Sequence, residues 1–359
     1  RAHNVFVDWL VSGGIPAFLL FIGLLVSAVL ALYRSEVSRA ERIFLTGAIA
    51  AYAFQALFVF DNLFTYIPLA AILAMAHVAS SRPFKQIDRL PVLGTTELNT
   101  VAPIMLVVGI ALVLAVNIPS MRAAGDLVHA ISGIPGGPQA NLDYFKKAVA
   151  DGSYGTQEIR EQLVSYANSV AANPSASNQL KDEFVRFAIS EMGKEVERAP
   201  LDARLRAQYA LIYETGGQYD KALEQVNEAI ALSPKKQSFY LQKANLLASA
   251  GKPTEARAVF HAAYDLAPSF PELAASAAAG DILAGDLAGG KAFLMEKLGT
   301  TTVNSTALVR AYYETKRYDD LVAIVQLQTR EAGNTGPSLL RLANAYGLAT
   351  RFTEARAVL

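Results

Sequence analysis

The chain has no cysteine among its 359 residues. This absence excludes disulfides, thiolate zinc sites and thiol nucleophiles. A basic excess is also missing, because 32 Lys and Arg balance 32 Asp and Glu, and we therefore expect no nucleic-acid partner. Histidine is scarce, and we interpret His129 and His261 as lacking the neighbouring acidic residues or second His of a metal site. We expect no metal and no cofactor.

Charge is scarce in one part of the chain, residues 1–118, which hold 7 of the 32 basic and 6 of the 32 acidic residues. About 20 helical residues cross the hydrocarbon layer of a bilayer, and about 17 is near the lower limit. We predict about four membrane spans in charge-free stretches, namely 15–33, 43–60, 64–79 and 101–118. The third is the shortest and contains Pro68, so a buried or interfacial helix is its alternative.

Basic residues of this region predict its topology. Six of the seven lie in two loops, and cytoplasmic loops carry the excess of Lys and Arg; they are Arg34, Arg39, Arg42, Arg82, Lys85 and Arg89. Two loops on one side require an even number of crossings between them, so 64–79 is expected to span. We therefore expect a multi-pass protein of the bacterial cytoplasmic membrane, with everything after Pro119 extracytoplasmic.

A 34-residue period runs through the rest of the chain. Pro200, Pro234 and Pro268 follow it, and so do the pairs Ala210 and Ala244, Gly217 and Gly251, Ala222 and Ala256, and Ala229 and Ala263. This is the period of tetratricopeptide (TPR) repeats, in which each unit is a pair of antiparallel helices. Prolines end the second helix, and glycines form the turn between the two helices. Looser units follow around 271–301 and beyond.

The predicted fold is all-α, a transmembrane helix bundle followed by a TPR α-solenoid. We assign 1–118 to the membrane region, 119–200 to a helical linker with a degenerate repeat, and 201–359 to a truncated array. The chain lacks an initial Met and stops within a helical pattern, so we expect a fragment of a longer protein. The concave face of such arrays binds other chains; a spacer or self-association module is the alternative.

The segment before the first span is the candidate chemical site. Arg1, His3 and Asn4 precede an apolar stripe of Val5, Phe6, Trp9 and Leu10, which we expect to face the bilayer. Histidine titrates near neutral pH, and arginine presents a fork suited to phosphate oxygens. Considered alone, these residues are more typical of an interfacial anchor.

The His3-Asn4 pair, the apolar stretch ending at Gly13-Gly14 and the span after it resemble the O-antigen ligase and polymerase superfamily. The segment from Phe58 to Asp61-Asn62 and the TPR tail are similar to members of that superfamily with such arrays. The resemblance covers essentially the whole chain. It implies a metal-independent glycosyltransferase that moves a glycan from undecaprenyl diphosphate to a lipid-core, glycan or protein hydroxyl, by ligation or polymerisation.

The resemblance also implies residue roles. His3 would be the general base, and Arg1 and Asn4 would bind the donor diphosphate. The superfamily's other arginines lie in spans and a loop upstream of the position that corresponds to Arg1, so we expect this fragment alone to be inactive. Besides the donor and membrane lipid, a protein partner on the concave TPR face is expected. The alternative function is a membrane-anchored TPR scaffold for envelope assembly, without catalysis.

Overall fold

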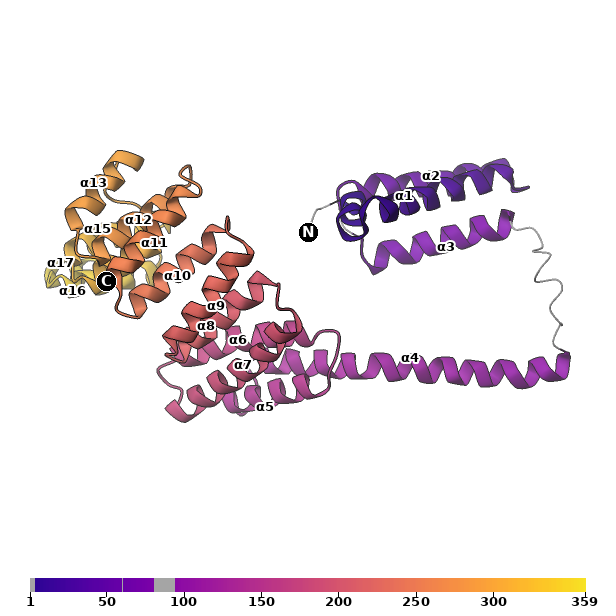
Figure 1. Cartoon of the computed structure of the whole chain (residues 1–359), viewed down its shortest axis with the longest axis horizontal. Helices are drawn as coiled ribbons and strands as arrows, with labels where there is room; N and C mark the ends of the chain where they lie inside the picture. Colours follow the sequence, from indigo (N-terminus) through magenta and orange to yellow (C-terminus); the bar gives the residue numbers. More distant parts are fainter. Residues whose placement is uncertain (1–3, 60, 81–93) are drawn as a thin grey trace. The chain divides into compact units, whose positions relative to one another are not determined.

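The structure, a computed structural model, describes residues 4–59, 61–80 and 94–359. Its described residues form seventeen α-helices and no strand (Figure 1). This confirms the all-α prediction. The chain divides into two compact units, residues 1–105 and 106–359, and each is described separately below.

The first unit contains three helices that pack against one another pairwise, α1 (Val5–Arg34), α2 (Arg39–Ala56) and α3 (Leu63–Ser80). Their shared core is aliphatic and aromatic, with Phe21, Leu32 and Ile49 among its buried members. Arg42 fixes the turn between α1 and α2, because its guanidinium donates to the carbonyls of Leu32, Ser35 and Val37 at 3.2, 3.1 and 3.4 Å.

Three described helices are long and apolar enough to cross a membrane: α1, α3 and the Leu98–Ile131 part of α4 (Thr95–Ile131). The sequence predicted a fourth at 43–60, which corresponds to α2. That helix instead begins at Arg39 and ends at Ala56, so its 18 residues include the charged Arg39, Glu41 and Arg42. Because of these charges, α2 is not among the helices that are apolar enough to cross a membrane.

The paired glycines break α1. Gly14 has φ 66° and ψ −168° inside the helix, a conformation that is essentially restricted to glycine. A side chain on Gly13 would lie 2.4 Å from Cβ of Ala17. Pro16 follows, and proline cannot donate the hydrogen bond that a continuous helix requires there. Two helical segments therefore meet at Gly14, and the straight part agrees with the predicted span 15–33.

This break turns the first segment back toward the span. The Trp9 and Phe21 rings stack with their centroids 5.5 Å apart, and Phe6 meets the same ring edge-on at 5.5 Å. A straight helix would separate residues 9 and 21 by about 18 Å. The predicted lipid-facing stripe is therefore wrong for Val5, which is buried at 2 % exposure, and Phe6 and Trp9 pack on their own span.

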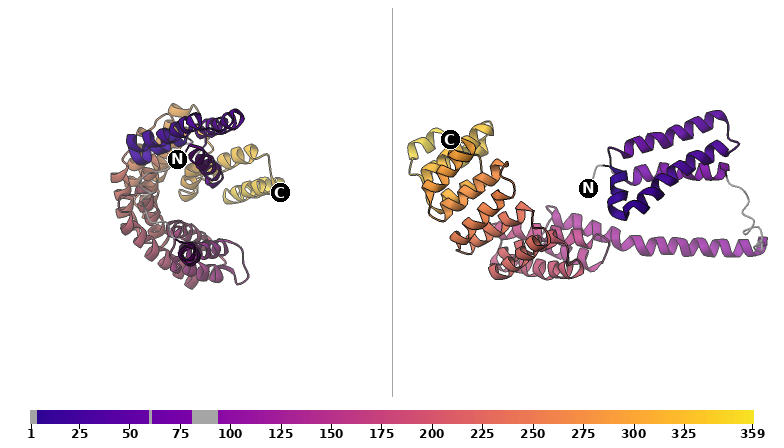
Figure 2. Two further views of the ribbon diagram at one scale, coloured as in Figure 1. Left: turned by 90° about the vertical axis from the view of Figure 1, so that its right-hand side faces the viewer. Right: turned by 45° about the horizontal axis from the view of Figure 1, so that its top comes forward.

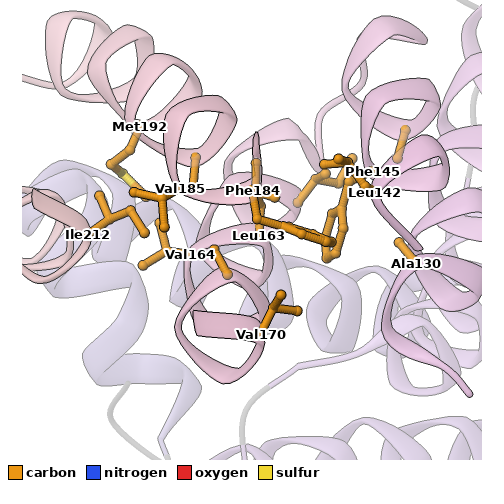
Figure 3. Close-up of a cluster of buried hydrophobic side chains, with 14 of the residues drawn as sticks. Ala130, Leu142, Phe145, Leu163, Val164, Val170, Phe184, Val185, Met192 and Ile212 are labelled. Atoms are coloured by element: carbon orange, nitrogen blue, oxygen red, sulfur yellow. The ribbon is translucent and has the colours of Figure 1, made fainter. Parts of the chain in front are cut away.

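The second unit begins with the carboxyl-terminal part of α4 and continues through α5 (Gly137–Ala150), α6 (Thr156–Ala172) and α7 (Asn178–Arg198). Their side chains build a continuous buried cluster with Leu205 and Ile212 of the first repeat (Figure 3). Asn141 anchors the loop after α4, because its amide donates to the carbonyls of His129, Ala130 and Ser132 at 3.1, 2.9 and 2.7 Å.

Five helix pairs follow as a curved array (Figure 2). They are α8 (Ala203–Thr215) with α9 (Tyr219–Leu232), α10 (Gln237–Ser249) with α11 (Pro253–Asp265), α12 (Pro271–Leu283) with α13 (Leu287–Leu298), α14 (Thr306–Glu314) with α15 (Tyr318–Glu331), and α16 (Gly336–Leu348) with α17 (Phe352–Ala357). Pro200, Pro234 and Pro268 each lie just beyond the helix they were predicted to end, α7, α9 and α11.

The turn inside each pair uses one hydrogen-bond pattern. Backbone N–H groups of Gln218, Lys252, Asp286, Arg317 and Arg351 donate to carbonyls five residues earlier at 2.8–2.9 Å. This is the Schellman arrangement, which needs a left-handed residue. Glycine occupies that position in the first three turns, but Lys316 (φ 57°) and Thr350 (φ 60°) occupy it in the last two. The degenerate units thus keep the repeat geometry without its glycine signature.

Candidate functional site

Asn4 joins two helices at one end of the first unit. Its side-chain oxygen accepts a hydrogen bond from the backbone N–H of Val7 at 3.0 Å and caps α1. Its side-chain amide donates to the carbonyl of Leu57 at 3.1 Å, where α2 ends. The residue predicted to bind the donor diphosphate therefore positions the amino end of α1 beside the α2–α3 connection.

Asp61 is the centre of a polar cluster at this same end. Its carboxylate accepts hydrogen bonds from the hydroxyl of Tyr52, 2.9 Å from each oxygen, and lies 3.2 Å from the hydroxyl of Thr65. The hydroxyl of Tyr66 interacts with the same carboxylate, and Asp8 lies near enough to act on Tyr66 electrostatically. Within the described ranges, Asp61 forms no ion pair. The cluster therefore presents negative charge and hydroxyl groups in an otherwise apolar bundle.

Asn62 starts α3 beside this carboxylate. Its side-chain oxygen accepts from the backbone N–H groups of Phe64 and Thr65 at 2.9 and 3.2 Å, and its own N–H donates to the Thr65 hydroxyl at 3.0 Å. This is a reciprocal cap of the kind that fixes a helix start. The Asp61-Asn62 pair thus holds a defined geometry and can offer a carboxylate to a bound polar group.

His3 and Arg1, the predicted base and the predicted diphosphate ligand, lie outside the described residues. Of the three sequence-predicted site residues, the structure therefore places Asn4. It brings Asn4 to Leu57, the residue just before the Phe58–Asn62 stretch that shares the resemblance stated above with the His3-Asn4 segment. Sequence reasoning missed Tyr52, which belongs to α2, and Thr65 and Tyr66, which belong to α3.

A buried charge network lies in the second unit. Arg160 contacts Glu191 at 3.1 Å and Glu195 at 2.6 Å, and Lys194 and Arg198 pair with the same two carboxylates. Glu195 is fully buried, which by itself raises its pKa, but hydrogen bonds from Arg160 and Arg198 outweigh burial and hold that pKa below the ordinary value. The pairs of Glu191 with Lys194 and Glu195 with Arg198 have helical i,i+3 spacing within α7. No spacing signal predicts that Arg160, which belongs to α6, joins them.

A cavity of about 890 Å³ lies on the last repeats, between α14, α15 and α16. Apolar side chains such as Val309, Tyr313 and Leu348 line it, together with Arg341 and Asn344. Tyr313 is 56 % exposed, and neither the Arg341 side chain nor the Asn344 side chain forms a hydrogen bond or ion pair with another described residue. An apolar cavity with a few polar groups is typical of a binding site.

Metal ligands do not converge in the part of the chain that the structure describes, where no group of three His, Asp or Glu side chains is close enough to hold an ion. His261 does have an acidic neighbour in the fold. Its Nε2 lies 2.9 Å from Asp281, which is twenty residues further along the chain. The contact crosses between helices, so local spacing did not reveal it.

Comparison with known proteins identifies the array. The tetratricopeptide repeat family model matches residues 203–236, which comprise the α8–α9 pair and the turn after it. The family match and the 34-residue period support a TPR solenoid from α8 onward. None of the curated proteins compared with the chain matches it.

Several solved structures are similar in fold. A thermophilic TPR protein of Thermus thermophilus is 17 % identical with a TM-score of 0.38, over 52 % of this chain and 98 % of that one. A TPR protein of Parabacteroides merdae is 14 % identical with a TM-score of 0.36, over 55 % and 77 %. The Cut9–Hcn1 hetero-tetramer of the APC/C is 12 % identical with a TM-score of 0.38, over 61 % and 41 %.

Proposed function

We propose that this chain is part of a membrane glycosyltransferase that moves a glycan from undecaprenyl diphosphate to a hydroxyl acceptor. The single observation that supports it most is the bond between the Asn4 amide and the Leu57 carbonyl. It holds Asn4, the residue after His3, at the end of α2 that precedes Asp61-Asn62, which supports placing both parts of the resemblance at one end of the bundle. Ligation and polymerisation both use this chemistry.

In the proposed reaction, His3 takes the proton of the acceptor hydroxyl as its oxygen bonds to the anomeric carbon. The bond between that carbon and the donor's phosphate oxygen breaks, and the lipid diphosphate leaves. Arg1 would stabilise the charge that grows on the leaving group. Asn4 holds the amino end of α1 in place through its two hydrogen bonds, and Asp61 with its hydroxyl partners Tyr52 and Thr65 would position the acceptor.

Replacing Asp61 by Asn tests this site. The carboxylate accepts from Tyr52 and Thr65, whereas an amide offers one acceptor oxygen and two donors in its place, so the hydroxyls must rearrange. We expect transfer by the intact protein to fall by about 10- to 100-fold, the scale of a misplaced reacting group. Transfer is measured in isolated membranes with a radiolabelled lipid-linked glycan.

The matched control is Glu41→Gln, which removes a carboxylate from the capping box at the amino end of α2, away from the Asn4–Leu57 contact. It should leave transfer unchanged. Full transfer by the Asp61→Asn protein, at a normal protein level, would exclude Asp61 from the site.

The site and the array are proposed to lie outside the cytoplasm. The basic loops of the sequence predict which side of the membrane each end occupies. This topology counts α2 as a crossing on the strength of its charge-free part from Ile43 onward, in addition to α1 and α3. Because the chain has no cysteine, single cysteines report on sidedness cleanly. An impermeant thiol reagent on spheroplasts should label Ser175→Cys and spare Glu36→Cys, which lies in the α1–α2 loop; the reverse pattern would contradict the topology.

A scaffold without catalysis is the second candidate, and the cavity on α14–α16 favours it. Arg341 and Asn344 border an exposed apolar surface that has no described partner within the chain. An extended partner chain with an acidic group would fill the cavity and pair with Arg341. Partner binding is compatible with catalysis elsewhere in the molecule, so finding a partner does not distinguish the two candidate functions. They are distinguished by whether variants of the proposed site lose glycan transfer.

A further inference from the structure

A pocket of about 610 Å³ lies in the second unit, where α4 meets α6, α7 and the loop before α6. One wall belongs to α4 and is largely apolar, with Ala115, Val116 and Pro119. The opposite wall is polar and carries Tyr154, Gln157, Arg160 and Arg198. Neither glycan transfer nor the cavity on the last repeats uses this pocket.

The depth of this pocket relative to a bilayer follows from α4 itself. Residues 98–121 of the helix carry no charge, and Arg122 is the next charged residue. At about 1.5 Å per residue this stretch is about 36 Å long, against about 30 Å of hydrocarbon. If α4 crosses the bilayer over this stretch, the wall from Ala115 to Ser120 occupies its last two turns, at the level of the lipid headgroups.

The charge that this pocket exposes is positive. Glu191 and Glu195 lie beneath its floor with side chains only 4 % and 0 % exposed, whereas the Arg198 side chain is 63 % exposed. Three cations share these two carboxylates, Arg160, Lys194 and Arg198. The network therefore carries one net positive charge, and of its two exposed cations, Lys194 and Arg198, Arg198 lines the pocket.

Tyr154 supplies an independent observation. Its ring is 92 % exposed, and its hydroxyl has no hydrogen-bond partner among the described side chains and backbone groups around it. Tyrosine is enriched at membrane–water interfaces, where the ring contacts the acyl boundary and the hydroxyl stays wet. A bare tyrosine beside the end of a membrane-length helix fits that environment.

We infer that this pocket binds the headgroup of an anionic phospholipid of the surrounding bilayer. The phosphate pairs with the Arg198 guanidinium, whose planar fork suits phosphate oxygens. Tyr154 packs at the glycerol level, and the acyl chains follow Val116 and the apolar face of α4. The lipid fastens the first helices of the array to the membrane surface, independently of any catalysis.

Native mass spectrometry of the full chain, released from nanodiscs of phosphatidylcholine and phosphatidylglycerol, tests the inference. The wild type should retain phosphatidylglycerol in preference to phosphatidylcholine. One surface cation contributes about 1 kcal/mol to anionic lipid binding, so Arg198→Gln should weaken retention about fivefold. Arg186→Gln is the matched control, because Arg186 is 73 % exposed and pairs only with Asp182 at 3.8 Å; it should have no effect.

Tyr154→Ser gives a second readout that leaves the charge network intact, and it should also reduce retention. Position 154 is probed directly by Tyr154→Trp in a Trp9→Phe background, since Trp9 is the single tryptophan. Brominated lipids should quench Trp at 154 and spare a Phe352→Trp control in the last repeat. Three results would each overturn the inference. They are equal lipid retention by the Arg198→Gln and Arg186→Gln proteins, absence of quenching at position 154, and stronger displacement of the bound lipid by undecaprenyl phosphate than by phosphatidylglycerol.

Discussion

Replacing Arg160 by Met is expected to destabilise the second unit by about 3 kcal/mol, because removal of one partner leaves buried charge unpaired. Glu191 and Glu195 are 3 % and 0 % exposed, and Arg160, itself 12 % exposed, donates to both. Lys194 and Arg198 remain on the rim. They limit the loss of stability but cannot replace Arg160 as the donor to the buried oxygens of Glu191 and Glu195. Urea unfolding of the full chain in detergent, followed by far-UV circular dichroism, measures the change.

Arg186→Met is the control for this experiment. Its ion pair with Asp182 spans 3.8 Å, and both side chains are 73 % exposed, so the free energy of unfolding should change by less than about 0.5 kcal/mol. Adding Glu191→Gln and Glu195→Gln to Arg160→Met removes the unpaired charges and should recover part of the loss. Equal unfolding midpoints for the Arg160 and Arg186 variants would show that the network does not stabilise the fold.

The same network makes stability depend on pH. The folded-state pKa of Glu195 lies below its ordinary value of 4.5, because hydrogen bonds from Arg160 and Arg198 overcome the effect of burial. A carboxyl whose pKa falls on folding stabilises the protein above the unfolded-state pKa, and this contribution is lost as pH falls through the folded-state pKa. Acid should therefore weaken the second unit below about pH 4.5, and Arg160→Met should remove this part of the pH dependence.

The repeat array is largely predictable from the sequence because its geometry depends on residue size at a fixed period. Ala210 and Ala244 are both buried to within 1 % exposure, as expected where helices approach closely. The last two turns were harder to predict. Lys316 and Thr350 adopt the left-handed conformation that glycine adopts in earlier units, because the neighbouring packed helices impose it on them.

The membrane end was predictable in composition but not in geometry. Apolar length located α1 and α3. The direction of the first segment of α1, however, depends on Gly14 and Pro16, which turn the chain back toward the span instead of ending the helix. The cluster around Asp61 gathers hydroxyls from α2 and α3. Only tertiary packing brings them together, so neither periodicity nor local spacing reveals them.

Replacing His3 by Ala in the intact protein tests the proposed glycan transfer most directly. Loss of a general base typically lowers a rate by about 10²- to 10⁴-fold. The variant should lose transfer of the lipid-linked glycan to that extent at a normal protein level. His129→Ala is the matched histidine control, because that ring packs against Tyr144 in the second unit, and it should retain transfer.

Transfer is followed by chromatography of the labelled glycan product, with wild-type, His3→Ala and His129→Ala membranes adjusted to equal protein. We expect loss of the labelled product in the His3→Ala membranes alone. Undiminished product from that variant would contradict glycan transfer at this site. If Arg341→Glu then abolished capture of a partner chain, the protein would instead be a membrane-anchored scaffold.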